Sequence, residues 1–273
     1  MPKCNPDFLF CIIDYFFLET QRKMKQYTTH PGFSASMADD KQLQELIRKV
    51  IIEERITHVF ESGTYLGKGS TRMIADAFAD VGAPKKFITV EANYFNWVKA
   101  VKNLEKYPFV TPVWGLTLNR EEAIEFVEND EMLRNADKYP DIYCDGGDDP
   151  HGFYTKEIKG EFGNSRFGIL NLIYNRKIKK EEKKYYEGEN MITKYLSGMK
   201  KNNPLVLLDS SGGVGYLEFK TTLNALEKEP FCIILDDIHH VKHHRSYNDI
   251  KNSPDFTVVG ENYNGGWLFA MRR

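Results

Sequence analysis

The stretch Val59–Thr71, VFESGTYLGKGST, decides the fold of this 273-residue chain. Its first residues belong to a short β-prone run, which predicts a strand over 58–62, and three glycines then remove side chains where the backbone must turn. We predict a helix over 70–80 after this turn, with Ser70 or Thr71 as its N-cap. Such a turn presents backbone N–H groups and the positive end of a helix to a ligand.

A second β-prone run, KFITV at 86–90, ends at Glu91. An acidic residue at the tip of the strand that follows a glycine turn is placed to accept hydrogen bonds from both hydroxyls of a ribose. Glu61, at the tip of the first strand, is predicted to face a ligand ammonium group. The glycine spacing matches neither the dinucleotide fingerprint nor the lysine-bearing P-loop. An acid for an amine, glycines for close approach and an acid for a ribose describe S-adenosylmethionine better than NAD.

Together these features resemble the class I S-adenosylmethionine-dependent methyltransferases, over roughly residues 40–273. The resemblance implies that S-adenosylmethionine is the cofactor and that it is bound by Glu61, Gly63, Thr64, Gly67, Ser70, Glu91 and Gly115. The Gly63–Gly67 backbone is expected beside the methionine portion, and Trp114–Thr117 near the adenine. For the glycine turn taken alone, a plain strand-to-helix connection is the alternative.

Apolar periodicity continues along the chain as alternating strands and helices. In the predicted helix 39–54, one face carries Leu43, Leu46, Ile47, Val50 and Ile51. Further strands are expected at 86–91, 109–114, 205–209, 231–236, 256–261 and 266–271, and helices at 94–105, 119–137, 189–200, 216–228 and 240–251. Strands separated by helices imply a parallel sheet, and the last two strands imply a hairpin. The predicted fold is therefore α/β: a Rossmann-like, seven-stranded, mostly parallel sheet with helices on both faces and a terminal antiparallel hairpin.

We predict an N-terminal helical extension over 1–38 and one methyltransferase domain over 39–273, with an insertion at about 138–188. The apolar run Phe8–Leu18 is too short to span a bilayer and predicts a helix that packs on the domain or on a second copy of the chain. Long insertions are functional lids, interface elements or mobile segments. Within this one, DGGDDPHG at 145–152 lacks calcium-loop spacing and is interpreted as a turn. The Lys/Glu run at 175–189 predicts a solvated helix face, with an anionic-ligand patch as the alternative.

Acidic residues follow two neighbouring apolar strands of the predicted sheet. LLDSSGG places Asp209 at one strand tip, and ILDDIHH places Asp236 and Asp237 at the next. Three converging carboxylates repel one another unless a cation lies among them, and an all-oxygen ligand set suits Mg²⁺. Ordinary strand-end aspartates that cap helices are the alternative.

This arrangement resembles the metal-dependent sugar O-methyltransferases (the macrocin O-methyltransferase type) and the related cephalosporin-hydroxylase-like branch. The resemblance implies that Asp209, Asp236 and Asp237 hold a divalent metal, which binds the substrate hydroxyl and lowers its pKa. After Asp209 those families often carry a polar pair such as Asp-His, whereas Ser210 and Ser211 follow here. The identity of the general base is therefore open.

Four of the seven histidines lie in HHVKHHRS, residues 239–246. On a helix, His239 and His243 would share a face, as would His240 and His244, at a spacing that can bind zinc. A base role is the hypothesis we favour, for His240 first and His239 second, with Asp209 as the third catalytic residue. Lys242 is an alternative contact for an anionic part of the substrate.

The predicted function is O-methyl transfer from S-adenosylmethionine to a hydroxyl of a saccharide or another small polar metabolite, assisted by a divalent metal such as Mg²⁺. The alternative is a non-catalytic cofactor-binding or scaffold protein with the same fold. A net charge of −2 gives no basic field for nucleic acid, and the Asn-Pro-Pro-aromatic signature of amino-methylating enzymes is absent. Four scattered cysteines predict free thiols in the cytoplasm. We expect no membrane span, and a homo-oligomer if Phe8–Leu18 packs on a second copy.

Overall fold

A seven-stranded sheet forms the centre of the molecule in a computed structural model that describes residues 37–159, 178–211 and 213–273. Its strand order is β3-β2-β1-β4-β5-β7-β6. The strands are β1 His58–Ser62, β2 Lys86–Glu91, β3 Val110–Trp114, β4 Leu205–Leu208, β5 Phe231–Leu235, β6 Phe256–Asn262 and β7 Trp267–Arg272. The first five run parallel, and β7 is antiparallel to both of its neighbours. The predicted fold class is confirmed.

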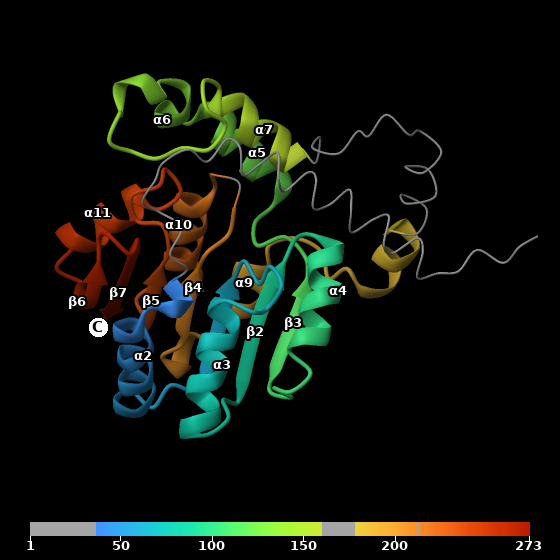
Figure 1. Ribbon diagram of the computed structural model, residues 1–273, viewed down its shortest axis with the longest axis vertical. Coiled ribbons are helices and arrows are strands. Elements are labelled where there is room, and N and C mark those ends of the chain that lie inside the picture. The colour runs from blue at the N-terminus through green and yellow to red at the C-terminus, as the bar shows by residue number, and fades with distance from the viewer. Residues whose placement is uncertain (1–36, 160–177, 212) are drawn as a thin grey trace, which may run out of the picture.

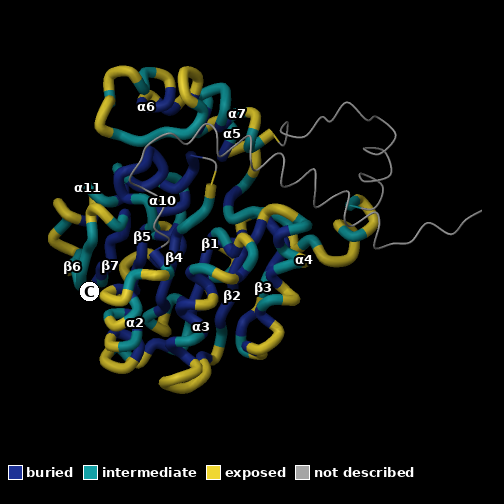
Figure 2. The backbone as a smooth tube through the Cα atoms, viewed as in Figure 1, coloured by how far each residue is buried: buried dark blue, intermediate teal, exposed yellow. Residues whose placement is uncertain are grey.

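Helices cover both faces of this sheet (Figure 1). One face is covered by α2 Lys41–Glu53, α3 Ser70–Val81 and α4 Tyr94–Asn103, and the other by α9 Met191–Leu196, α10 Gly215–Leu226 and α11 His244–Asn252. Figure 2 shows β1, β2, β4, β5 and β7 as mostly buried, whereas β6 at the edge is only half-buried. The apolar face predicted for the first helix is confirmed, because its buried residues are Leu43, Ile47, Val50 and Ile51, with Leu46 packed partly buried beside them.

Asp40 fixes the start of α2 and joins it to the terminal hairpin. One of its carboxylate oxygens accepts hydrogen bonds from the N–H groups of Gln42 and Leu43, which makes it the N-cap. The other oxygen accepts from Trp267 Nε1 and Asn262 Nδ2, at 2.8 and 3.0 Å. One side chain therefore holds the first described helix against the last two strands.

The predicted helix 119–137 is wrong as a single element. It is divided into α5 Arg120–Asn129, α6 Glu131–Arg134 and the 3₁₀ turn η2 Ala136–Lys138. The break lies at Asp130, which has extended backbone angles and whose carboxylate caps α6. The same carboxylate pairs with Arg245 of α11. A long-range ion pair thus stabilises a break that local helical periodicity does not show.

Several other helix boundaries also differ from the prediction. The helix expected over 189–200 is α9 followed by the 3₁₀ turn η3 Lys200–Asn202, and the helix expected from residue 240 begins at His244. The short 3₁₀ turn η1, Met37–Asp39, precedes α2. None of the described helices is long and apolar enough to span a membrane.

The described part of the insertion contains a helix that was not predicted, α7 Pro150–Lys159. Figure 1 shows α5, α6 and α7 gathered at one end of the sheet. Of the predicted turn 145–152, residues 145–149 are irregular as expected, but 150–152 begin α7, so the prediction is wrong there. Residues 178–185 are helical with mostly exposed side chains, which confirms a solvated helix face there. The remainder of the insertion and the predicted helix at Phe8–Leu18 lie outside the described residues.

Candidate functional site

The glycine turn is tied to the strands on both sides of it. The N–H groups of Gly63 and Thr64 both donate to the carbonyl of Val90, at 3.0 and 3.1 Å, which anchors the turn to the end of β2. On its other side the turn meets β4, because a Cβ atom on Gly63 would lie 2.2 Å from the carbonyl oxygen of Asp209. Gly63 also has φ +89°, a backbone conformation that L side chains rarely adopt. Only glycine therefore fits at this position.

Glu61 lies beneath the turn and has no exposed surface. Its two carboxylate oxygens accept hydrogen bonds from the hydroxyls of Ser70 and Thr89, at 2.7 and 2.6 Å, and Thr89 in turn contacts the Thr64 hydroxyl. Burial raises the pKa of Glu61 to about 7, although the hydroxyls of Thr89 and Ser70 act in the opposite direction. The side chain predicted to face a ligand ammonium is thus an internal brace of the turn in this structure.

The predicted capping role of Ser70 or Thr71 is wrong. The N-cap of α3 is Gly69, which has no side chain, and the Ser70 hydroxyl donates to Glu61 instead. The start of α3 is therefore fixed by the carboxylate below it. Gly67, with φ +65°, packs against the side chain of Leu104, whereas a Cβ on Gly69 would meet no atom within 4 Å. The turn is open on the side of Gly69.

Glu91 connects the turn to the end of β2. Its two oxygens each accept one backbone N–H, from Tyr65 of the turn and from Asn93 at the start of α4, both at 2.7 Å. Burial raises the pKa of Glu91 to about 7, while the N–H groups of Asn93 and Tyr65 lower it. The side chain of Asn96 and the N–H of Ala92 also lower this pKa, so the carboxylate is held in place by donors from the turn and from the start of α4.

The segment predicted to lie near an adenine follows β3. Gly115 donates its N–H to the carbonyl of Glu91, and Leu116 donates to the carbonyl of Gly188. A Cβ on Gly115 would lie 2.9 Å from that same Gly188 oxygen. The indole of Trp114 stacks on Trp97, with ring centroids 5.9 Å apart. The end of the insertion thus packs directly on this segment.

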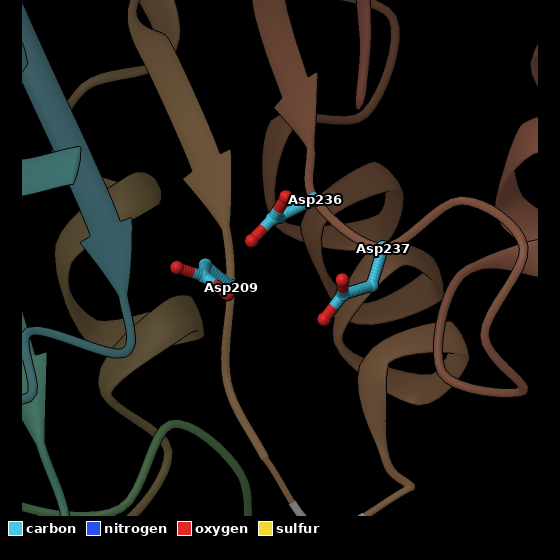
Figure 3. Close-up of side chains that lie close together, drawn as sticks. All are labelled: Asp209, Asp236 and Asp237. Carbon is cyan, nitrogen blue, oxygen red and sulfur yellow. The ribbon is translucent and has the colours of Figure 1, made fainter. Parts of the chain in front are cut away.

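The three predicted metal ligands come together beyond β4 and β5 (Figure 3). Asp209, Asp236 and Asp237 each offer a carboxylate oxygen, and these oxygens lie within 4.8 Å of one another. Asp237 has φ +53°, an uncommon conformation for a residue other than glycine. The backbone N–H of Asp209 donates to Ser62 of β1, and that of Asp236 donates to Leu208 of β4. Neighbouring strand ends therefore fix the cluster.

Lys242 supplies a positive charge to these carboxylates. Its Nζ lies 2.8 Å from Asp237 Oδ2 and 3.2 Å from Asp209 Oδ1, and its side chain is only 7% exposed. Burial favours a lower pKa for Lys242, but Asp237 and Asp209 outweigh it and hold that pKa well above its usual range. Burial likewise opposes ionisation of Asp237, yet Lys242 lowers the pKa of that carboxyl to about 2. Burial, followed by the charge of Asp209, raises the pKa of Asp236 well above its usual range.

His239 and His240 point in opposite directions. The ring of His239 lies against Tyr263 and Gly266 of the terminal hairpin. His240 Nε2 lies 3.0 Å from the Tyr154 hydroxyl and 3.3 Å from Asp145 Oδ2. The Lys242 N–H donates to His240 Nδ1 at 3.2 Å, which assigns the proton of the neutral ring to Nε2. Both nitrogens of His240 are therefore engaged within the protein.

The helical zinc face, which was the alternative to a base role for these histidines, is not formed. Residues 241–243 are a turn and α11 begins at His244, so the histidines of 239–244 do not share a helical face. Among the described residues, the three aspartates are the one group of at least three side chains with a metal-ligand arrangement, and no histidine belongs to it. A Cβ on Gly215 would lie 2.7 Å from the ring of His243, which shows how tightly α10 packs on that turn.

Sequence reasoning missed functional neighbours that come from the insertion and from α10. Asp145 and Tyr154, which contact His240, lie in a segment interpreted only as a turn and in a helix that was not predicted. Glu218 is fully buried and accepts hydrogen bonds from Ser62, Ser210 and Thr117. The one signal for it is a glutamate on the otherwise apolar face of the predicted helix 216–228.

The two implied ligands differ in how well the residues suit them. The open side of the turn and the held carboxylate of Glu91 suit S-adenosylmethionine. The oxygens of the three aspartates are of the kind that Mg²⁺ prefers, but the Lys242 ammonium already contacts two of the carboxylates. A divalent ion at the same pair would have to displace this ammonium, because two adjacent cations repel each other. The cluster as arranged therefore does not fit the ion, and Mg²⁺ stays a prediction.

No family model and no curated protein matches the chain. Solved structures of low similarity include an O-methyltransferase from Bacillus cereus in complex with S-adenosylhomocysteine, which is 13% identical with a TM-score of 0.45 over 93% of this chain and 89% of the other. A candidate caffeoyl-CoA O-methyltransferase from Staphylococcus aureus is 14% identical with a TM-score of 0.45 over 98% of each chain. The O-methyltransferase TomG from Streptomyces achromogenes, in complex with S-adenosylmethionine, is 12% identical with a TM-score of 0.41 over 86% of this chain and 79% of the other. We therefore base the fold on the strand order itself.

Proposed function

We propose that this protein transfers the methyl group of S-adenosylmethionine to a hydroxyl of a saccharide or another small polar metabolite. The observation that carries the proposal is the contact of Gly63 with the backbone of Asp209. It joins the predicted cofactor turn to the acidic cluster between β1 and β4, where the strand order reverses. In open parallel sheets, ligands bind beyond the carboxyl ends of the strands at such a point.

Glu91 and the glycine turn are the residues that would hold the cofactor. When bound, S-adenosylmethionine supplies an electrophilic methyl group on a sulfonium. Glu91 would accept the ribose hydroxyls, and its bonds to Tyr65 and Asn93 hold it ready to do so. Gly63, Thr64 and Gly67 shape the turn itself, and Ser70 holds Glu61 beneath it. Gly115 lets the end of the insertion approach the neighbouring segment closely.

The acceptor hydroxyl must lose its proton as the new bond forms, and we assign the proton to Asp209. Asp209 is the residue of the cluster whose backbone packs on the glycine turn, through the close approach of its carbonyl to Gly63. His240 and His239 stay candidates from sequence. The bonding of both nitrogens of His240 within the protein, and the contact of His239 with the terminal hairpin, favour Asp209 over either. Because Mg²⁺ does not fit the cluster as arranged, no step of this proposal uses a divalent ion.

Calorimetric titration with S-adenosylmethionine tests the cofactor assignment. Glu91→Ala should weaken binding by about thirtyfold or more, since loss of a charged hydrogen-bond acceptor costs about 2 kcal/mol. Glu91→Gln checks whether a local collapse of the turn is responsible, because it keeps an acceptor oxygen of similar size. Glu45→Ala, an exposed position on α2, is the matched control. Equal affinities for the wild type and Glu91→Ala would overturn the assignment.

The alternative is a protein that binds the cofactor without turnover. Incubation with methyl-labelled S-adenosylmethionine and a panel of saccharides and small polyols separates the two. Transfer to any acceptor supports the enzyme, and tight binding without transfer to any member supports the scaffold. We also propose a cytoplasmic setting, since Cys144 and Cys232 are both free thiols. With a net charge of −2, we propose no nucleic-acid partner, and a homo-oligomer stays a prediction.

A further inference from the structure

Lys242 occupies the position that a divalent cation would take among the three aspartates. Its ammonium contacts Asp237 at 2.8 Å and Asp209 at 3.2 Å, and Asp236 completes a group of carboxylates within 4.8 Å. We propose that Lys242 is the resident cation of this cluster, so that the aspartates are held together without a metal ion. The carboxylate oxygens by themselves would suit Mg²⁺, but the Lys242 ammonium already lies among them.

The turn that carries Lys242 is held by three contacts, which keep the ammonium at the carboxylates. Within its own turn, the Lys242 N–H donates to His240 Nδ1 at 3.2 Å. From α10, Gly215 approaches so closely that a Cβ there would lie 2.6 Å from the Lys242 carbonyl oxygen. From the insertion, the Tyr143 carbonyl accepts the N–H of Val241 at 2.8 Å. The turn therefore cannot shift as a unit without breaking contacts to two other elements.

Charge balance favours the lysine over an added ion. If a divalent ion bound to Asp209 and Asp237, the ammonium would lose both of its carboxylate partners. With a side chain that is 7% exposed, Lys242 would then be a buried charge without a counterion, which is strongly unfavourable. If the ammonium stayed, the two cations would repel each other at close range. Either outcome makes the cluster a weak site for divalent ions.

The ammonium also has a task in the proposed reaction, and this step rests on the proposed function. As the acceptor O–H bond breaks, its proton passes to the Asp209 carboxylate and negative charge builds on the oxygen. The new O–CH₃ bond forms while the methyl–sulfur bond breaks, and sulfur keeps the electron pair. Lys242, which contacts Asp209, supplies the positive charge that stabilises the oxygen. This is the role that a metal ion has in the sugar O-methyltransferases that the sequence resembles.

Binding of Mn²⁺, followed by electron paramagnetic resonance on the full chain in chelator-free buffer, tests the cation assignment without any need for turnover. The wild type and Asp237→Asn should bind Mn²⁺ equally weakly. Lys242→Met should bind at least about tenfold more tightly, because removal of the ammonium exposes three carboxylates to the ion. Lys251→Met, which removes a lysine paired with Glu261 on the surface, is the matched control and should behave as the wild type.

Mn²⁺ binding by the wild type tests the proposal even if Lys242→Met does not fold. Tight Mn²⁺ binding by the wild type that Asp237→Asn abolishes would overturn the proposal. Lys242→Arg keeps a cation in place and should exclude Mn²⁺ as the wild type does, and strong binding by this variant would also overturn it. Failure of the proposed function would appear separately, as unchanged S-adenosylmethionine affinity in Glu91→Ala. If both proposals hold, methyl transfer by the wild type continues in excess chelator.

Discussion

Replacement of Glu61 by glutamine should change how the stability of the protein depends on pH. Burial raises the pKa of this carboxyl from 4.5 to about 7 in the folded chain. In the unfolded chain the pKa of Glu61 is near its ordinary value. At a pH between the unfolded and folded pKa values, the folded state therefore keeps a proton that the unfolded state has lost. The free energy of unfolding therefore falls as pH rises from about 4 to about 7, and the contribution is constant above that.

The size of the effect follows from the shift. A difference of about 2.5 pKa units at ~1.4 kcal/mol per unit corresponds to roughly 3 kcal/mol. Glutamine has a shape similar to that of glutamate but does not ionise. The difference in unfolding free energy, wild type minus Glu61→Gln, should therefore fall by about this amount between pH 4 and pH 8. Glu91, whose pKa is also raised to about 7, is present in both proteins and cancels in the difference.

Urea unfolding followed by circular dichroism at unit steps from pH 4 to pH 8 gives the required free energies. Glu45→Gln, which removes an exposed carboxyl from α2, is the matched control. A constant difference for Glu61→Gln, within about 0.5 kcal/mol, would show that Glu61 is ionised as it is in water. The description of Glu61 as a buried brace with a raised pKa would then be wrong.

Three further changes test the contacts that hold the site in place. Asp40→Ala should lower the free energy of unfolding in urea by about 2 kcal/mol, because a helix cap and two side-chain hydrogen bonds are lost, whereas Asp40→Asn should lose only part of it, because its one amide oxygen can keep either the cap or the bonds to the hairpin. Arg245→Met leaves the buried carboxylate of Asp130 without its cation and should cost about 3–5 kcal/mol, part of which Asp130→Asn should restore in the double variant. Gly63→Ala should cost at least about 2 kcal/mol and weaken S-adenosylmethionine binding, since its Cβ would clash with the backbone of Asp209; an unchanged midpoint would contradict the close approach.

The sheet could be predicted because its strands are short apolar runs whose ends coincide with glycine or acidic residues. The predicted strands 58–62 and 86–91 match β1 and β2 to the residue, and 205–209 and 231–236 each extend only one residue past the observed strand. The convergence of Asp209 with Asp236 followed from the same logic, since parallel neighbouring strands end at one edge. These features depend on patterns only a few residues long, which the sequence displays directly.

The remaining features depend on contacts between residues far apart in the chain. The break at Asp130 is stabilised by Arg245, which is 115 positions away. The first turn expected for α11 instead packs against α10, because Gly215 leaves space for the Lys242 carbonyl and the His243 ring. Local periodicity in 240–251 favours a helix throughout and contains no sign of that packing. Lys242 was considered for an anionic substrate, and its pairing with the chain's own aspartates could be known only from the fold.

Ser210 is a position at which this chain departs from the families that it resembles, and its hydrogen bond gives the departure a structural reason. In the families that the sequence resembles, a polar pair such as Asp-His often follows the residue that corresponds to Asp209. Here the Ser210 hydroxyl donates to Glu218, a fully buried carboxyl that also accepts from Ser62 and Thr117. Burial raises the pKa of Glu218, so this carboxyl resists ionisation and depends on these hydroxyl donors. Through Glu218, residue 210 therefore connects the ends of β1 and β4 with the segment after β3, which is a structural role, and this is consistent with our proposal that Asp209, and not the residue after it, takes the acceptor proton.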